Sequence, residues 1–559
     1  MSRNQNSHFS QIPQADIRRS KFTRNHSHKT TFNAGKLIPI YVDEMLPGDT
    51  FSMDTSIFCR MSTPIYPVMD NAYMDYYYFF VPNRLIWDHW SEFMGENTSA
   101  PWAQTTEYSI PQVITGSAPL NTFNSGCVAD YMGLPLNVTG ISVSALPFRA
   151  YVLIWNEWFR SENVDYPAYF VTSDANRTLE VAGTESETID GGALLPVDKF
   201  HDYFTSALPA PQKGAPVTVP IGENAIVRTA ANDLITSGYD SLNPLRMTGP
   251  GSPSAAYHLM VHAGVPGTPG KVYVDTSTST PVGSNPTSAP TNLYADLSDA
   301  TSVTINALRQ AFQVQRLLEL DARGGTRYVS LIKAHFGVTS PDARQQRPEY
   351  LGGKRFPLNM QQVLQTSATD TTSPQGNTAA FSATSSVHSD FTYSATEHGW
   401  LIGVACVRTD HTYQQGINRM WSRKGRYDFY WPALAHLGEQ AILNKEIYAT
   451  GSGSVGSQDN NAFGYQEAWA EYRYKPSFVS GAMRSNAGQG SLDSWHYADY
   501  YESLPRLSSS WLQETDANIN RTLAVKSDLA DQFICDINFR LTCVRPMPLY
   551  SIPGLIDHI

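Results

Sequence analysis

The sequence predicts a mainly β protein, a β-sandwich or jelly roll that carries large loop insertions and a few helices. Two segments near opposite ends of the chain, Phe51–Met61 and Phe533–Cys543, alternate apolar and polar residues with the period of a half-buried strand. Helical patterns are few, and the connections are long and rich in Gly, Pro, Ser and Thr, as in sandwiches and jelly rolls. The 559 residues have room for roughly three or four domains, or for one β core with insertions.

The predicted strands differ in the number of faces that they bury. In Phe51–Met61 the odd-numbered positions are mostly apolar, and the turn Pro47-Gly48-Asp49 precedes them. Phe533–Cys543 repeats this alternation, which predicts one buried face. Tyr73–Val81 and Leu401–Arg408 are apolar on both faces, so each of these two strands needs cover on both sides.

Two segments predict helices. In Phe148–Phe159 the apolar residues recur on one helical face, and Pro147 stands at a favourable first-turn position. A longer helix is predicted from Thr304 to Arg323, and Gly324 with Gly325 ends it. Its apolar stripe is formed by Leu308, Ala311, Phe312 and Leu318.

The clearest shift in composition covers residues 215–300, which are rich in turn-forming residues and poor in periodicity. The apolar pieces Tyr257–Val261 and Lys271–Val274 predict short strands there, so we expect an ordered excursion rather than a flexible linker. Two smaller Ser/Thr/Gly-rich patches, Thr366–Ser386 and Thr450–Asn461, are expected to be surface loops.

The composition favours association with other subunits. Charged residues make up 16% of the chain, against about 25% in an average globular protein. Aromatic residues reach 12%, and interface cores lose charge while they gain Tyr, Trp, Phe and Met. The alternative is a large uncharged polar surface made of Ser, Thr, Asn and Gln.

The cysteines and the apolar runs restrict the compartment of the protein. Five cysteines form no CxxC pair and leave an odd count, so neither a disulfide framework nor a Cys-based zinc site is expected, and a reducing compartment is the simpler inference. No apolar run approaches the ~18 residues of a membrane span, and the polar N-terminus does not resemble a secretory signal. We expect no membrane association.

Positive charge is concentrated at the N-terminus. The chain has a net charge of −11, yet its first 36 residues hold seven Lys and Arg against one acidic residue. A basic arm on an acidic body indicates a segment that faces nucleic acid, and Phe9, Phe22 and Phe32 could stack on unpaired bases. The alternative is a solvated terminus without a specific role.

The sequence contains no motif that predicts a catalytic, cofactor or metal site. Gly451, Gly453 and Gly456 match GxGxxG, but no apolar strand precedes them directly and no helix follows, so we interpret them as a loop. His26 and His28 form an HxH pair without an acidic or Cys partner nearby. Glu467 and Glu471 could pair on a helix, but a solvated face neutralised by Arg473 or Lys475 is the commoner arrangement.

The run RMWSRKGRYDFYW, Arg419–Trp431, interleaves four basic and five aromatic residues. One interpretation is a platform for single-stranded nucleic acid, in which guanidinium groups contact phosphates and rings stack on bases. The other is an intersubunit or core segment, in which Arg pairs with acidic residues and the rings pack.

Several long stretches resemble the major capsid protein of the gokushoviruses, a branch of the Microviridae. The stretches are FNAGKLIPIYVDEMLPGDTF (Phe32–Phe51), YYYFFVPNRLIWDHW (Tyr76–Trp90), LPFRAYVLIWNEWFR (Leu146–Arg160), SALPAPQKG (Ser206–Gly214), LRQAFQVQRLLELDARGGTRY (Leu308–Tyr328), HFGVTSPDARQQRPEYLGG (His335–Gly353) and RKGRYDFYWPALAHLGEQAI (Arg423–Ile442). They are long and idiosyncratic, and they span nearly the whole chain except residues 215–300.

The resemblance implies a viral jelly roll, an eight-stranded antiparallel β-sandwich or barrel, that builds a T=1 icosahedral capsid around circular single-stranded DNA in a bacterial host. Residues 1–36 would be an interior-facing basic arm, and residues 37–214 and 301–559 the jelly-roll core with its insertions. Residues 215–300 would form a variable surface protrusion near the threefold axes that could contribute to binding a host-surface receptor. The implied partners are further copies of the chain, an internal scaffolding protein and a small basic DNA-binding protein.

The function expected on these grounds is that of a self-assembling structural protein of the virion, assembled in the bacterial cytoplasm, without enzymatic activity or cofactor. The DNA-binding residues are expected to be Arg18, Arg19, Lys21, Arg24 and Lys29, which would contact phosphates without reading sequence. The main alternative is a jelly-roll carbohydrate-binding protein or glycosidase, which would require a paired-carboxylate site. A minor virion or attachment protein is a third possibility.

Overall fold

The computed structural model divides into two compact units, Met1–Lys213 with Glu319–Ile559, and Gly214–Leu318. Apart from residues 219–303, the structure describes residues 18–97, 106–116, 121–181, 183–184, 186–218, 304–367, 374–451, 458–488 and 490–550. Between residues 219 and 303 it describes six strands: β9 (Ile226–Thr229), β10 (Arg246–Met247), β11 (Tyr257–His262), β12 (Lys271–Asp275), β13 (Thr280–Pro281) and β14 (Leu293–Asp296). The two short strands predicted within this excursion are therefore present as β11 and β12, which pair antiparallel.

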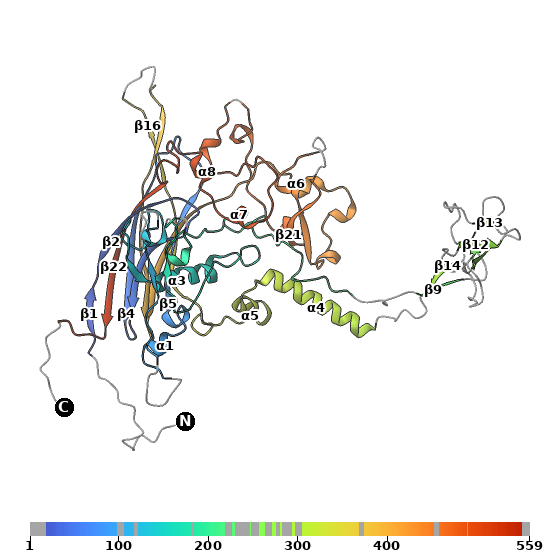
Figure 1. The fold of residues 1–559 in the computed structure, drawn as a ribbon. Helices are drawn as coiled ribbons and strands as arrows, with labels where there is room; N and C mark the ends of the chain where they lie inside the picture. The colour runs from blue at the N-terminus through green and yellow to red at the C-terminus, as the bar shows by residue number, and fades with distance from the viewer. Residues whose placement is uncertain are drawn as a thin grey trace. The chain divides into compact units, whose positions relative to one another are not determined.

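Two antiparallel sheets form the first unit's sandwich (Figure 1). The first sheet has the order β1 (Ser20–Thr23), β22 (Phe533–Arg545), β4 (Thr50–Met61) and β18 (Thr384–Ser394), with β2 (His26–Phe32) also paired to β22. The second has the order β15 (Glu349–Pro357), β5 (Ala72–Pro82), β19 (Gly399–Thr409) and β3 (Ile38–Met45). With β1 and β2 counted as one strand, consecutive strands switch sheets except at β5 and β15, which pair within one sheet. This is the two-Greek-key order of a jelly roll, which confirms the predicted fold class.

Alternation along β4 and β22 builds the core between the sheets. Phe51, Met53 and Ile57 of β4 and Phe539 and Leu541 of β22 are at most 1% exposed, as the period of two predicted. The predicted turn at residues 47–49 precedes β4, with a hydrogen bond of 3.0 Å from the Asp49 N–H to the Leu46 carbonyl. The core buries one face of each strand, and the intervening residues lie on the outward face.

The second sheet is covered on its outer face as well. Phe79 and Val81 of β5 point away from the core between the sheets and pack with α3 (Leu146–Ile154) and its surroundings. This helix confirms the predicted one, although its last turn, Trp155–Phe159, is a π-helix. The expectation that β5 and β19 need cover on both faces is thus confirmed, and the segment between β5 and β15 supplies that cover.

The other predicted helix is present as α4 (Ile305–Gly324), followed by α5 (Tyr328–Phe336). Of its predicted apolar stripe, Leu308 and Phe312 are 42% and 64% exposed, whereas Ala311 and Leu318 are half-buried. The interpretation of residues 366–386 as a surface loop is wrong for its second half, because β17 (Thr378–Ser382) pairs with β16 (Met360–Leu364) and β18 begins at Thr384. Its Ser, Thr and Ala residues gave no strand signal, although β17 pairs with the preceding β16 and β18 pairs with the distant β4.

A third layer of short elements follows β19 and contains β20 (Glu439–Leu443) and β21 (Ala462–Glu467). The remaining helices and strands are α1 (Trp90–Phe93), β6 (Gln112–Ile114), α2 (Val128–Tyr131), β7 (Ser142–Ser144), β8 (Arg177–Thr178), α6 (Asn444–Ile447), α7 (Ser509–Leu512) and α8 (Ala517–Asn520). No helix in the described ranges is long and apolar enough to cross a membrane. All five cysteines are free and buried.

Candidate nucleic-acid interface

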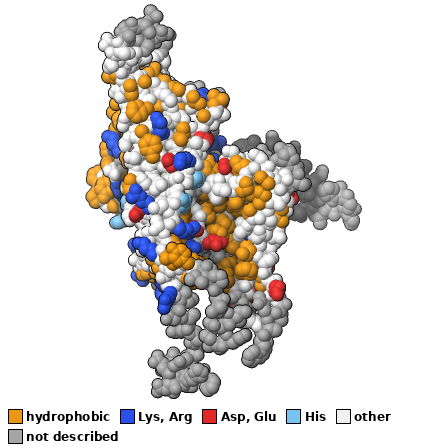
Figure 2. All heavy atoms as spheres, turned by 90° about the vertical axis from the view of Figure 1, so that its left-hand side faces the viewer, with side chains coloured by type: hydrophobic (Ala, Val, Ile, Leu, Met, Phe, Trp, Pro, Cys, Tyr) orange, Lys and Arg blue, Asp and Glu red, His pale blue; other side chains and the backbone are white. Residues whose placement is uncertain are grey.

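The outward face of the first sheet gathers basic side chains from four strands. Register places Lys21 of β1 and Lys29 of β2 on the same face as Arg540 of β22 and Arg60 of β4. All four are exposed, and the only acidic residues that β4 and β22 add to this face are Asp54 and Asp536. Figure 2 shows this side of the molecule, where Lys and Arg are scattered among hydrophobic and uncharged side chains.

The five residues predicted to bind DNA fall into two groups. Arg18, Arg19 and Lys21 are exposed and form no ion pair with any described residue. Arg24 instead pairs with Asp43 of β3 at 2.5 Å, and thereby links the edges of the two sheets. Lys29 lies 3.6 Å from Asp536 but remains 74% exposed.

Residues 20–23 and 26–32 belong to the first sheet as β1 and β2, although the sequence assigned them to a basic arm. Their pairing with β22 fixes the backbone positions of Lys21 and Lys29. On a free arm, the same residues would lose conformational entropy when they bind DNA. The arm that precedes the sheet is therefore shorter than expected, and its residues 1–17 lie outside the described residues.

Arg60 and Arg540 are basic residues of this face that were not among the predicted DNA-binding residues. Each occupies a polar position in one of the two alternating segments, Phe51–Met61 and Phe533–Cys543. The alternation predicted that both side chains would point outward, and this was the available signal. Only the strand pairing shows that β4 and β22 lie side by side, with Asp54 opposite Arg540.

A hollow of about 970 Å³ adjoins β2 at the side of this sheet. Its lining includes three cations, Lys29, Lys36 and Arg60, together with the exposed ring of Phe58. Asp531, which also lines it, accepts hydrogen bonds from Thr31 and Asn33 and so is held by local partners. The lining also holds Asp130, Glu514, Asp516 and Asp536, so acidic side chains outnumber cations and the hollow is not a cationic site for phosphate.

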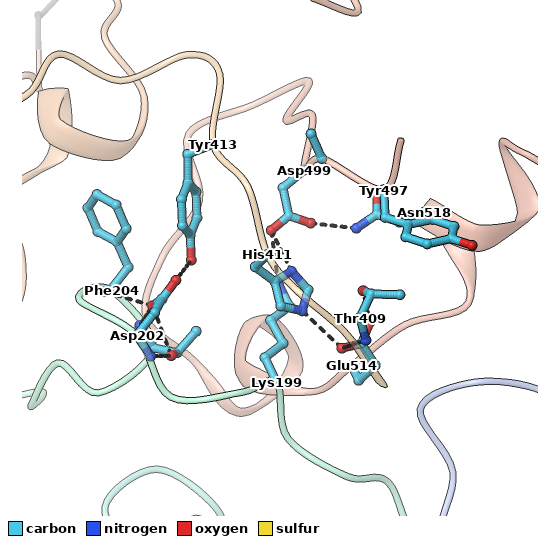
Figure 3. A network of polar contacts seen from close by, with 12 residues as sticks. Lys199, Asp202, Phe204, Thr409, His411, Tyr413, Tyr497, Asp499, Glu514 and Asn518 are labelled. Atoms are coloured by element: carbon cyan, nitrogen blue, oxygen red, sulfur yellow. Dashed lines mark hydrogen bonds and ion pairs between the residues drawn. The ribbon is translucent and has the colours of Figure 1, made fainter. Parts of the chain in front are cut away.

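Buried carboxylates elsewhere serve the structure rather than chemistry. His411, 8% exposed, lies between Asp499 and Glu514, with each of its ring nitrogens 2.9 Å from a carboxylate oxygen (Figure 3). Lys199 Nζ lies 3.8 Å from Asp499, and Asn518 donates to the same carboxylate at 2.6 Å. The glycosidase alternative would need such a pair open to substrate, but these carboxylates are buried and fully engaged.

The charge state of this cluster follows from its geometry. Burial lowers the pKa of His411, but the two carboxylates outweigh that effect and raise the pKa to about 10. Burial likewise opposes the ionisation of Asp499, and the charges of His411 and Lys199 hold its pKa well below the ordinary value. The imidazolium is therefore the positive centre of a buried ionic cluster that ties β19 to the segment before β22.

The remaining sequence motifs give no site for chemistry. Residues 452–456 of the GxGxxG match lie outside the described residues. His28 contacts the Ile40 carbonyl at 3.1 Å, and the described part of the chain holds no cluster of three or more His, Cys, Asp or Glu able to bind a metal. Glu467 and Glu471 do not share a helix: Glu467 pairs with Arg473, and Glu471 lies 3.2 Å from Arg423.

The first unit is a jelly roll of the viral type, and the described residues form no catalytic constellation. The chain belongs to the family of phage capsid proteins described as capsid protein (F protein), whose model matches residues 10–555. The predicted resemblance is thus confirmed, and the protein is a phage capsid protein, a component of the virion and not an enzyme. The carbohydrate-binding or glycosidase alternative is wrong.

Three relatives support this assignment over nearly the full length. A capsid protein VP1 from Bdellovibrio phage phiMH2K is 43% identical over 559 residues, which cover 99% of this chain and 98% of the relative. A capsid protein VP1 from Chlamydia phage 1 is 42% identical and covers 98% of this chain and 97% of the relative. A capsid protein VP1 from Spiroplasma virus 4 is 41% identical with the same coverage. Membership of a capsid family implies assembly into a multimeric shell.

Proposed function

We propose that copies of this chain assemble into a T=1 icosahedral shell around a circular single-stranded DNA genome, inside a bacterial host cell. The observation that carries the proposal is the basic outward face of the first sheet, with Lys21, Lys29, Arg60 and Arg540 aligned across paired strands. In this arrangement the jelly roll is the rigid wall of the shell, and the first sheet is turned toward the genome.

The contacts with DNA in this arrangement are electrostatic and independent of sequence. Lys and Arg side chains that neutralise phosphates release counterions, and this release supplies affinity without reading bases. Phe58, 46% exposed beside Arg60, offers a ring on which an unpaired base can stack. Single-stranded DNA suits such a face better than duplex, whose bases are already stacked.

Reversal of three charges tests the proposed orientation. We expect a triple Arg18→Glu, Arg19→Glu and Lys21→Glu variant to form shells but to package clearly less DNA, because these cations form no ion pair with described residues. The ratio of nucleic acid to protein in purified particles measures the effect. For free subunits, the salt slope of single-stranded DNA binding should fall by roughly 2, at about 0.7 per lost phosphate contact.

The matched control reverses three other exposed cations, Lys213, Arg506 and Lys526, which lie outside the strands of the first sheet. This variant changes the net charge equally, so its packaging should stay close to that of the wild type. Equal packaging by both variants would refute the assignment of the first sheet to the interior. Arg24 is left intact because its ion pair with Asp43 joins the sheets.

The charge balance supports one further partner of the proposed shell, a small basic DNA-binding protein. The chain carries a net charge of −11, and the basic face adds only a few cations per subunit. Packaged DNA has one negative charge per nucleotide, so a small, strongly basic DNA-binding protein would supply most of the neutralisation. An internal scaffolding protein would hold subunits in register while the shell forms.

Residues 215–300 are proposed to project as a protrusion near the threefold axes and to contribute to recognition of a host-surface receptor. Their compact unit is distinct from the jelly roll by contact clustering, which is the arrangement expected of a surface module. We expect replacement of residues 215–300 by a short Gly/Ser linker to spare particle assembly while reducing adsorption to host cells at least tenfold. Particle yield and adsorption rate measure the two effects, and unchanged adsorption would remove this role.

A further inference from the structure

An exposed aromatic surface lies after β19 and again after β21. Its members are between 40% and 76% accessible: Met420, Trp421, Tyr427, Phe429, Tyr430, Trp431, Tyr472, Tyr474 and Phe478. Most belong to the Arg419–Trp431 run, for which the sequence allowed either a nucleic-acid platform or a packed segment. Because the rings are exposed, packing within the core of this chain is excluded.

The members form a connected surface. Tyr430 and Tyr472 have ring centroids 6.2 Å apart, and the Tyr430 N–H donates to the Tyr472 hydroxyl at 3.3 Å. The Arg423 guanidinium lies 4.3 Å from the centroid of Tyr472 and so joins the two segments. Beside them, a hollow of about 430 Å³ is lined by Trp421, Phe478 and others.

The size of this surface exceeds what a soluble monomer ordinarily exposes. Eight aromatic rings, each exposing about half of its roughly 150–250 Å² of surface, present on the order of 800 Å². The largest apolar patch of a typical monomer covers about 300–600 Å². A standard protein interface buries about 800 Å² on each partner, so the aromatic surface has the area of one complete interface.

The chemistry of the surface favours a protein partner over nucleic acid. Arg419 lies 3.5 Å from Glu446, and Arg423 lies 3.2 Å from Glu471, so both guanidinium groups are already paired. The Arg426 guanidinium covers a face of Trp431 at 4.8 Å, as Arg423 does for Tyr472. A strand of nucleic acid would need free cations and open ring faces, whereas aromatic, Met and Arg side chains with few free charges are typical of protein interfaces.

We propose that the aromatic surface is buried against a second copy of this chain. This inference rests on the proposed shell, in which each copy is surrounded by others at fixed positions. Every subunit carries this surface, and because it has the area of a full interface, each subunit needs one partner. Another copy of the chain is the partner that is always present in equal number. Trp421 and Phe478, with 76% and 69% exposure beside the hollow, are the expected anchors of the contact.

Thiol protection tests this contact directly. All five native cysteines are buried, so a Trp421→Cys variant carries a single accessible thiol. We expect N-ethylmaleimide to modify this thiol rapidly in the free subunit and at least tenfold more slowly in the assembled particle, both with and without DNA. A Val387→Cys variant is the control, because Val387 is 68% exposed on the outward face of the first sheet. Its modification in empty particles verifies that the reagent passes through the shell.

Each outcome decides the proposal. Equal modification of the Trp421→Cys variant in particles and free subunits would refute it, and protection that vanishes in empty particles would assign the surface to nucleic acid. If Trp421→Cys subunits melt like the wild type but form no particles, the contact is essential and the proposal is supported. Tyr427→Cys, at a position 73% exposed on the same surface, then repeats the labelling. Failure of the wild type to form any particle would instead refute the proposed shell.

Discussion

We expect His411→Ala to lower the free energy of unfolding of the free subunit by roughly 3–5 kcal/mol, the usual cost of removing one partner from a buried ion pair. The imidazolium lies 2.9 Å from both Asp499 and Glu514, whose side chains are 7% and 0% exposed. Without it, two buried carboxylates would lose their shared cation, and Lys199 would remain 3.8 Å from Asp499. Guanidinium denaturation of the purified subunit measures the loss.

His89→Ala is the matched control for this substitution. His89 lies the same 2.9 Å from Asp174, but both side chains are more than a third exposed. Water and salt screen such a pair, so the expected loss is at most about 1 kcal/mol. Similar losses for both variants would show that burial does not set the strength of the His411 cluster.

The cluster also predicts how stability depends on pH. The pKa of His411 is about 10 in the folded chain, against an ordinary value of 6.5. A raised pKa means that the folded state holds the proton more tightly, so the stabilisation is complete below pH 6.5 and is lost as pH rises toward 10. The stability difference between wild type and His411→Ala should shrink over that interval, while that for His89→Ala should change little.

The second large effect is expected at Trp87, whose side chain is fully buried between α1 and the second sheet. We expect Trp87→Ala to cost about 3–5 kcal/mol, because it leaves a large cavity among packed rings. It also removes the hydrogen bond of 2.6 Å from the indole to Asp174. Denaturant unfolding of free subunits measures this loss.

Trp421→Ala supplies the comparison, since the same atoms are removed from a side chain that is 76% exposed. The free subunit should retain its stability within about 0.5 kcal/mol, as for most surface substitutions. Particle yield should nevertheless fall, because the aromatic surface is proposed to be buried only between copies. A large loss of subunit stability in Trp421→Ala would show that this side chain supports the fold of the single chain.

The strands at both ends of the sequence could be predicted because their signal is local. Alternation within Phe51–Met61 and Phe533–Cys543 reports the burial of every second side chain, wherever the strand is placed. The same reasoning applies to α3, whose apolar face is evident from its spacing. Periodicity does not predict the burial of Arg149 in that helix. This side chain is fully buried and donates hydrogen bonds to the carbonyls of Ile86 and Ser173.

The candidate interface was predicted in part. A basic N-terminus was evident from composition, and Arg18, Arg19 and Lys21 are exposed as a DNA-binding role requires. Composition did not reveal that Arg24 is held by Asp43, or that Arg60 and Arg540 share the face. The first relation joins two sheets and the second joins strands hundreds of positions apart, and neither follows from composition.

The sequence by itself thus determined the fold class, the strands with one or two buried faces, and the low-charge, aromatic-rich composition of a protein that associates. The tertiary structure decided which strands are neighbours, as in the pairing of Cys59 with Cys535 across 476 positions. It also decided which charges are neutralised, as in the cluster of Lys199, His411, Asp499 and Glu514. The physical reason is that periodicity is a property of adjacent residues, whereas strand partners and ion pairs depend on long-range closure of the chain and on the shared packing of both sheets.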